Sequence, residues 1–127
     1  MSIIGLGVDI VETSRIAELM GNHPERFLDR CFTKGEQEDS ESNKRQIEHL
    51  AARFAAKEAV LKALGTGWSQ GIGWTNIEVV KEPSGKPTLK ITGRAKEIAD
   101  GLGILKWHLS LSHISTHAVA SVIAESE

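Results

Sequence analysis

The sequence predicts an α+β fold in a single domain, residues 1–127, and three features of the chain support this. A β-branched apolar segment with glycines opens the chain, a long stretch of helical periodicity lies in its middle, and two strand-like segments close it. The predicted order is strand, helices, hairpin, helix and two strands, which is typical of an α+β domain. A chain of 127 residues is long enough to bury its own core.

The first third of the chain predicts a strand followed by short helices. Ile3–Val11 is apolar, β-branched and interrupted by glycines, as in a buried strand. Thr13–Met20 is expected to be a short helix capped by its own first hydroxyl and stopped at Gly21. Pro24–Cys31 begins with a proline suited to a first helical turn. Thr33–Glu36 then has the Thr-x-x-Glu form of a capping box.

The best helix signal runs from about Lys44 to Leu64. Apolar residues recur there near helical spacing, Gly65 is placed to end the helix, and Asn43 is its expected cap. The polar residues 40–44 before it are expected to form a loop or a frayed end.

The last third predicts a hairpin, a short helix and two strands. Thr75–Lys81 and Thr88–Thr92 flank a turn at Pro83–Lys86, which indicates a β-hairpin. Gly93–Leu102 is expected to be a helix, and Trp107–Ser112 and Ala118–Ala124 are the last two strands.

Composition argues against several classes of protein. The net charge of -2 is unlike the basic excess of proteins with a dominant nucleic-acid or anionic-membrane surface. Cys31 is the only cysteine, so no intrachain disulfide forms and a reducing compartment fits. The N-terminus has no basic region typical of a signal peptide, and no apolar run approaches the roughly 20 residues of a membrane span. We expect a cytoplasmic protein without a nucleic-acid or membrane partner.

Glu58 and Lys62 are the first candidates for chemistry. They lie four residues apart on the long helix and therefore share a face. One interpretation is a solvated ion pair that contributes a few tenths of a kcal/mol. The other is a ligand site. Alanines surround the pair, so another backbone or a ligand can approach closely, and the helix runs into Gly65-Thr66-Gly67, whose backbone permits a close approach to phosphate.

Asp9 lies near the end of an apolar strand, where a carboxylate needs a partner. It either caps the following turn or binds a metal. Mg²⁺ binds proteins through one or two carboxylates and takes further oxygens from water and substrate phosphates. Asp9 and Glu58 suit that pattern, but the spacing alone does not bring them together.

Two later motifs have both a structural and a functional interpretation. Ser84-Gly85-Lys86-Pro87 is a hairpin turn whose lysine and free amides would also suit a phosphate. Ser112-His113 ends a strand, and its histidine is either exposed and structural or part of a site.

Taken together, these segments resemble the holo-[acyl-carrier-protein] synthase family, the small trimeric type of 4′-phosphopantetheinyl transferase. The resemblance spans nearly the whole chain in family order, and its central helix motif is the most specific part. The matching segments are Gly7–Glu12, Arg53–Ala59, Lys62–Gly67, Gly85–Pro87, Ser110–His113 and Ala118–Ala120.

The resemblance implies an antiparallel sheet packed against a long helix, in a homotrimer with active sites between subunits. It implies transfer of 4′-phosphopantetheine from coenzyme A to a serine of acyl carrier protein, for fatty acid biosynthesis. Asp9 and Glu58 would bind Mg²⁺, and Lys62 would steady the diphosphate. Either Glu58 or Asp9, the latter through water, would be the base. The implied coenzyme A-binding positions are Arg53, Gly85, Lys86, Pro87, Ser112 and His113.

The resemblance also implies a docking surface for the acidic carrier protein. Arg15 and Arg26 match family docking positions, and Phe27 is expected to pack against an apolar spot between them. The alternative is that these are ordinary solvated arginines. Two other functions remain open: a non-catalytic module that binds a nucleotide or carrier protein, and a Mg²⁺-dependent phosphohydrolase.

Overall fold

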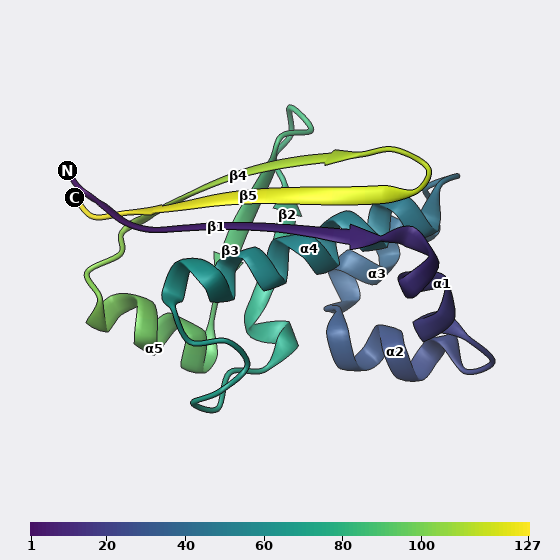
Figure 1. Cartoon of the computed structure of the whole chain (residues 1–127), viewed down its shortest axis with the longest axis horizontal. Coiled ribbons are helices and arrows are strands. Elements are labelled where there is room, and N and C mark those ends of the chain that lie inside the picture. Colours follow the sequence, from purple (N-terminus) through teal and green to yellow (C-terminus); the bar gives the residue numbers. More distant parts are fainter.

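A three-stranded antiparallel sheet lies along one long helix in the computed structural model, which describes residues 1–127 (Figure 1). The sheet order is β1 (Ile3–Glu12), β5 (His117–Glu125), β4 (Lys106–His113), and the helix is α4 (Gln46–Leu64). The N- and C-terminal strands are therefore neighbours, paired from Ile3 opposite Glu125 to Glu12 opposite His117. This arrangement confirms the predicted α+β class and the sheet packed on a long helix.

The remaining elements lie around the other sides of α4 (Figure 1). Three short helices follow β1, and a separate two-stranded hairpin, a 3₁₀ turn and a last helix follow α4. Their bounds are α1 (Thr13–Met20), α2 (Pro24–Cys31), α3 (Lys34–Glu41), η1 (Trp74–Asn76), β2 (Ile77–Lys81), β3 (Pro87–Ile91) and α5 (Gly93–Gly101). None of these helices combines the length and apolar composition that crossing a bilayer requires.

Close contact between β1 and α4 depends on glycine. A Cβ atom on Gly7 would lie 1.8 Å from the carbonyl oxygen of Ala59, and one on Gly5 would lie 2.1 Å from that of Ala63. Side chains alternate along a strand, so Asp9 and Val11 share this inner face with the two glycines. The predicted close approach at the alanines of α4 is confirmed, and its occupant is the backbone of β1.

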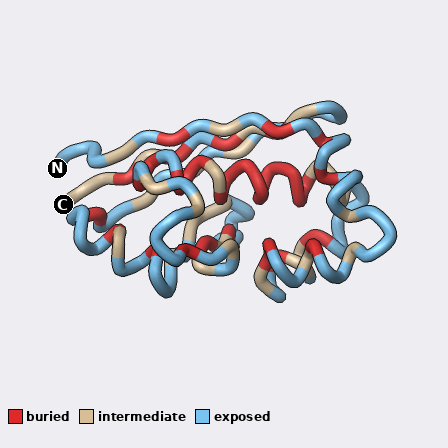
Figure 2. Tube along the Cα trace, turned by 60° about the horizontal axis from the view of Figure 1, so that its bottom comes forward, coloured by how far each residue is buried: buried red, intermediate tan, exposed pale blue.

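The core is built around α4, which is buried on nearly every side (Figure 2). Small alanines in this helix let the sheet and the short helices approach it. The inner residues of β5 close the core above: Ala118, Ala120, Val122 and Ala124.

The outer face of the sheet is apolar and uncovered in the protomer. On β1 it consists of Ile4, Leu6, Val8 and Ile10, and Leu6 is 65% exposed. Val119 and Ile123 of β5 pair with Ile10 and Leu6 and so lie on the same face. The expectation of a strand buried on both faces is therefore wrong for a single protomer, because no element of the chain covers this side.

Two predicted caps are wrong because tertiary or neighbouring contacts take the capping groups. The Thr13 hydroxyl donates to the carbonyl of Ser115, and Glu12 is the N-cap of α1. The Asn43 side chain accepts from the backbone N–H of Arg45, so α4 begins at Gln46 without a side-chain cap. The capping box at Thr33 and Glu36 and the end of α4 at Gly65 are confirmed.

Candidate active site

Asp9 and Lys62 meet on the inner side of β1. Lys62 Nζ donates to Asp9 Oδ1 at 3.2 Å and to the carbonyl oxygen of Val8 at 2.8 Å. Side chains on a helix lean towards its N-terminus, so Lys62 reaches back along α4 to the strand residue beyond Gly7. The Asp9 side chain is 19% exposed, which leaves it accessible to a ligand.

Glu58 lies one helical turn before Lys62 and is partly buried. The structure gives it no ion pair with Lys62. Its Oε1 instead accepts a hydrogen bond from the indole Nε1–H of Trp68 at 3.4 Å. The solvated Glu58–Lys62 pair is therefore absent, because Lys62 is taken up by Asp9.

The carboxylates of Asp9 and Glu58 suit a metal ion that needs few protein ligands. The structure has no cluster of three or more His, Cys, Asp or Glu side chains arranged to hold a metal. A closed structural metal site is thus not built here, whereas Mg²⁺ typically binds one or two carboxylates and completes its shell with water and phosphate. Asp9 and Glu58 are carboxylates of the kind that this ion binds, and their sharing of one Mg²⁺ stays a prediction.

Arg53 lies on the first half of α4 and is buried. Its guanidinium is 3.8 Å from Asp39 Oδ2, and desolvation lowers its pKa, against the opposing effect of the nearby carboxylates. Lys81 lies 3.3 Å from the other oxygen of Asp39. In one protomer Arg53 therefore forms an ion pair with Asp39 and is buried. Its predicted contact with coenzyme A stays a prediction.

His49 completes this cluster and is only 5% exposed. Burial lowers its pKa to about 4, and the positive charge of Arg53 acts in the same direction. Its Nδ1 contacts the Asn43 amide at 3.1 Å, whereas its Nε2, 3.2 Å from Asp39, is not aligned for a hydrogen bond.

The other predicted site residues have different neighbours from Asp9. The Gly85–Pro87 turn joins β2 to β3, and Lys86 and Pro87 line a cleft of about 370 Å³ with residues 106–109 of β4. His113 Nδ1 lies 2.8 Å from Glu48 in the first turn of α4. Ser112 pairs with Val119 and faces the outer side of the sheet, opposite to His113. One protomer thus separates the predicted residues into distinct groups.

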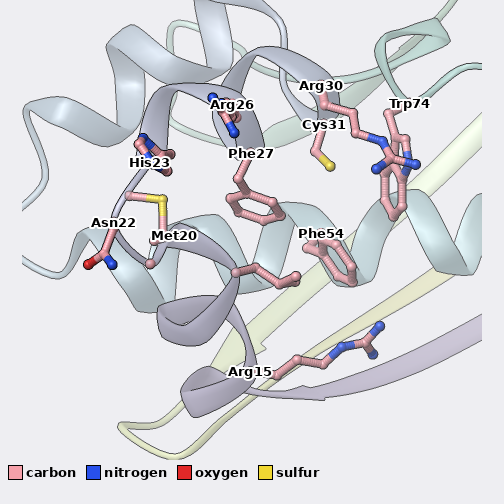
Figure 3. Close-up of a pocket in the computed structure, with 12 residues that line it drawn as sticks. Arg15, Met20, Asn22, His23, Arg26, Phe27, Arg30, Cys31, Phe54 and Trp74 are labelled. Atoms are coloured by element: carbon pink, nitrogen blue, oxygen red, sulfur yellow. The ribbon is translucent and has the colours of Figure 1, made fainter.

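The predicted docking residues gather at one cavity. Arg15, Arg26 and Phe27 line a cavity of about 510 Å³ between the short helices and α4, and Arg30 joins them. Figure 3 shows the three arginines around the rings of Phe27 and Phe54. Phe27 is only 8% exposed, so it forms the floor of the cavity and does not project from its rim.

Comparison with known proteins decides the family. Residues 5–122 match the family model described as the 4′-phosphopantetheinyl transferase superfamily. The chain belongs to this superfamily. Holo-[acyl-carrier-protein] synthase of Koribacter versatilis is 48% identical over 123 residues, covering 97% of this chain and 98% of the relative.

Solved structures of other transferases share the fold. The holo-[acyl-carrier-protein] synthase of Neisseria meningitidis aligns with a TM-score of 0.89 at 33% identity, covering 98% of this chain and 100% of that one. That of Bacillus anthracis, in complex with CoA (3′,5′-ADP), aligns with a TM-score of 0.81 at 36% identity, covering 98% of both chains.

The sequence did not reveal the aromatic residues next to Glu58. Trp74 stacks on Phe54 with ring centroids 4.8 Å apart and packs against Trp68 at 3.9 Å. Both tryptophans come from residues 65–76, a glycine-rich segment after α4. A large aromatic residue directly after Gly65-Thr66-Gly67 is the signal that would have found Trp68.

Proposed function

We propose that this protein transfers 4′-phosphopantetheine from coenzyme A to a serine of apo-acyl carrier protein, releasing 3′,5′-ADP. The observation that carries the proposal is the meeting of Asp9 with Lys62, one helical turn from Glu58, in a chain of the phosphopantetheinyl transferase superfamily. The relatives named holo-[acyl-carrier-protein] synthase, and the CoA bound to the Bacillus anthracis relative, support the choice of substrates.

The reaction needs charge neutralisation, alignment and removal of one proton. The serine hydroxyl forms a new O–P bond with the β-phosphorus of coenzyme A, and the bond from that phosphorus to the bridging oxygen breaks. Lys62 is 55% exposed and able to turn from Asp9 to the diphosphate, where its charge stabilises the leaving group. Mg²⁺, held by Asp9 and Glu58, would supply further positive charge to the phosphates. Glu58 is the proposed base, with Asp9 acting through water as the alternative.

The proposal includes a homotrimer whose sites lie between subunits. An apolar face as large as the outer side of the β1–β5 pair is unusual on a monomer and typical of an interface between chains. Asp9, Lys62 and Glu58 have no contact with the Gly85–Pro87 turn of their own chain. This supports a site between subunits, in which a neighbouring subunit would supply the turn.

The cavity between α1, α2 and α4 is the proposed docking surface for the carrier protein. Three arginines around buried aromatic rings suit a helix with acidic residues around an apolar side chain. Arg15 also lies over the Phe54 ring, 5.4 Å from its centroid, which holds its charge at the cavity. We expect the reaction in the cytoplasm, where the free thiol of Cys31 stays reduced.

Mass spectrometry of apo-acyl carrier protein incubated with coenzyme A, Mg²⁺ and this protein tests the proposal. The carrier is expected to gain one phosphopantetheine group. Intact coenzyme A and an unmodified carrier would indicate a binding module, and free phosphopantetheine with an unmodified carrier would indicate a phosphohydrolase.

A further inference from the structure

A buried lysine, two stacked tryptophans and Glu58 form one connected chain of contacts behind the site. We propose that Trp68 is a positioning residue for Glu58, held by a stack on Trp74 that buried Lys57 anchors. This inference rests on the proposed function, because it assigns Trp68 a role in placing the carboxylate of that same site.

The chain of contacts begins at Lys57, which has no exposed surface. Its ammonium lies 2.8 Å from Glu36 Oε1, also buried, and donates to the backbone carbonyls of Trp74, at 3.1 Å, and of Ile77. Glu36 Oε2 in turn accepts from the backbone N–H of Val79. A buried charge is stable only when it is paired and hydrogen-bonded, so this arrangement fixes the backbone at Trp74 relative to α4.

The second step is the aromatic stack. The Trp74 ring contacts both Phe54 of α4 and Trp68, with centroid distances of 4.8 and 3.9 Å. Residues 65–73, which carry Trp68, contain Gly67 and Gly71 at φ values of +61° and +81°. Glycine gives such a segment many conformations in the absence of contacts. Because Lys57 fixes the backbone of Trp74, the stack of Trp68 on Trp74 selects the loop conformation that places Trp68 against α4.

The last step is the hydrogen bond from Trp68 to Glu58. The indole N–H can only donate a hydrogen bond, and Oε1 of Glu58 accepts it at 3.4 Å. Glu58 has no other hydrogen bond within the protomer. The indole thus limits the rotamers of the side chain and leaves Oε2 for the reaction. A carboxylate that is already ordered loses less conformational entropy when it binds the metal ion.

The variant Trp68→Phe separates the hydrogen bond from the stack, because phenylalanine keeps an aromatic ring against Trp74 and removes only the donor. Glu97→Gln is the control, since Glu97 is an exposed residue of α5 whose only ion pair is with Arg94. The Mn²⁺ dissociation constant, measured in the presence of coenzyme A by electron paramagnetic resonance, is expected to rise about threefold to tenfold in Trp68→Phe alone. The turnover number is expected to fall with it, and the KM for the carrier protein to stay unchanged.

A second measurement needs no activity. The three indole N–H resonances of the free protein are assigned by the Trp→Phe variants, and Glu58→Gln is then expected to move the Trp68 resonance and leave that of Trp107 in place. Transfer activity combined with an unmoved Trp68 resonance, or with an unchanged Mn²⁺ dissociation constant in Trp68→Phe, would overturn the positioning role alone. A wild-type protein that modifies no carrier would instead overturn the proposed function, whatever the spectrum shows.

Discussion

Asp9 and Lys62 form an ion pair in the free protomer, and a charged ligand can replace this contact. Lys62 is more than half exposed, so its ion pair with Asp9 is screened and contributes little to stability. Both side chains are therefore available to a ligand that brings its own charges. A diphosphate accompanied by a cation would give each of them a new partner of opposite charge.

Asp9→Asn is predicted to remove activity while leaving the fold intact. Asp9 would hold the cation that neutralises the reacting phosphates, and loss of one such electrostatic contribution typically costs about 10²- to 10³-fold in rate. Since the pair with Lys62 is a surface-type interaction, the Tm is expected to stay within about 5 °C of the parent. Carrier modification followed by mass spectrometry and a thermal melt check both expectations. Glu97→Gln, on exposed α5, is the control, and a variant that keeps more than a tenth of the parent rate would contradict the role of Asp9.

Arg15→Ala is predicted to weaken binding of the carrier protein and to spare coenzyme A. Arg15 lines the docking cavity, so its loss reduces the attraction of an acidic partner, and the KM for the carrier is expected to rise about tenfold. The effect should shrink as salt increases, because screening already weakens the attraction in the parent. Steady-state kinetics with each substrate varied in turn provide the test. Lys96→Ala, which removes an exposed positive charge paired with Asp100 on α5, is the control. An unchanged KM for the carrier in Arg15→Ala would contradict docking at this cavity.

At the scale of elements, the packing of β1 on α4 sets the position of Asp9, and Gly7 permits it. Gly7→Ala is predicted to destabilise the protein by at least about 3 kcal/mol, because the new methyl group would overlap the Ala59 carbonyl and neither backbone can yield cheaply. Urea unfolding measures the loss. Gly101→Ala is the matched control, since its Cβ would meet no atom within 4 Å, and it is expected to change stability by less than about 1 kcal/mol. Equal stability of the two variants would show that β1 does not pack as described.

The packing of α3 against α4 makes stability depend on pH through His49. Its folded pKa of about 4 lies below its ordinary value of 6.5, so the unfolded chain binds the proton first as pH falls. Its contribution to stability is full above pH 6.5 and is lost as pH falls towards 4, at a cost of up to about 3 kcal/mol. Asn43, Asp39, Arg53 and Lys81 surround the ring. Urea unfolding at pH 7 and pH 4.5 is expected to show a smaller loss in His49→Gln than in the parent; parallel losses would contradict the buried neutral histidine.

Elements defined by local signals were predictable from the sequence, and those that depend on distant contacts were not. Periodicity and Gly65 located α4, and the capping box located the start of α3, because both signals act within a few residues. The hydroxyl of Thr13 bonds Ser115, a partner 102 residues away that no local pattern reveals. In the same way, no local pattern indicates that Lys57 is buried, and only the fold shows its partner Glu36 buried beside it.

The candidate site was predictable in part for the same reason. The motifs and their family resemblance put Asp9, Glu58 and Lys62 in one candidate site, but they did not predict the ion pair of Asp9 with Lys62, because neither motif shows the distance. Trp68 belongs to no motif, and its contact with Glu58 depends on the path of a glycine-rich segment. Ser112 and His113 lie on opposite faces of the sheet because side chains alternate along a strand, and their predicted contacts with coenzyme A stay predictions.

At the scale of the whole molecule, the outer sheet face connects assembly to activity. Leu6→Lys is predicted to prevent trimer formation, because it places a charge in the middle of the apolar face. Activity is expected to fall with assembly, even though Leu6 points away from Asp9, since the proposed site needs residues from two subunits. Sedimentation velocity and the carrier-modification assay, run at the same protein concentration, measure the two effects together. Leu102→Lys replaces another exposed leucine, at the end of α5 and outside the sheet, and is expected to leave both unchanged. A monomeric Leu6→Lys protein with full activity would show that each protomer carries a complete site.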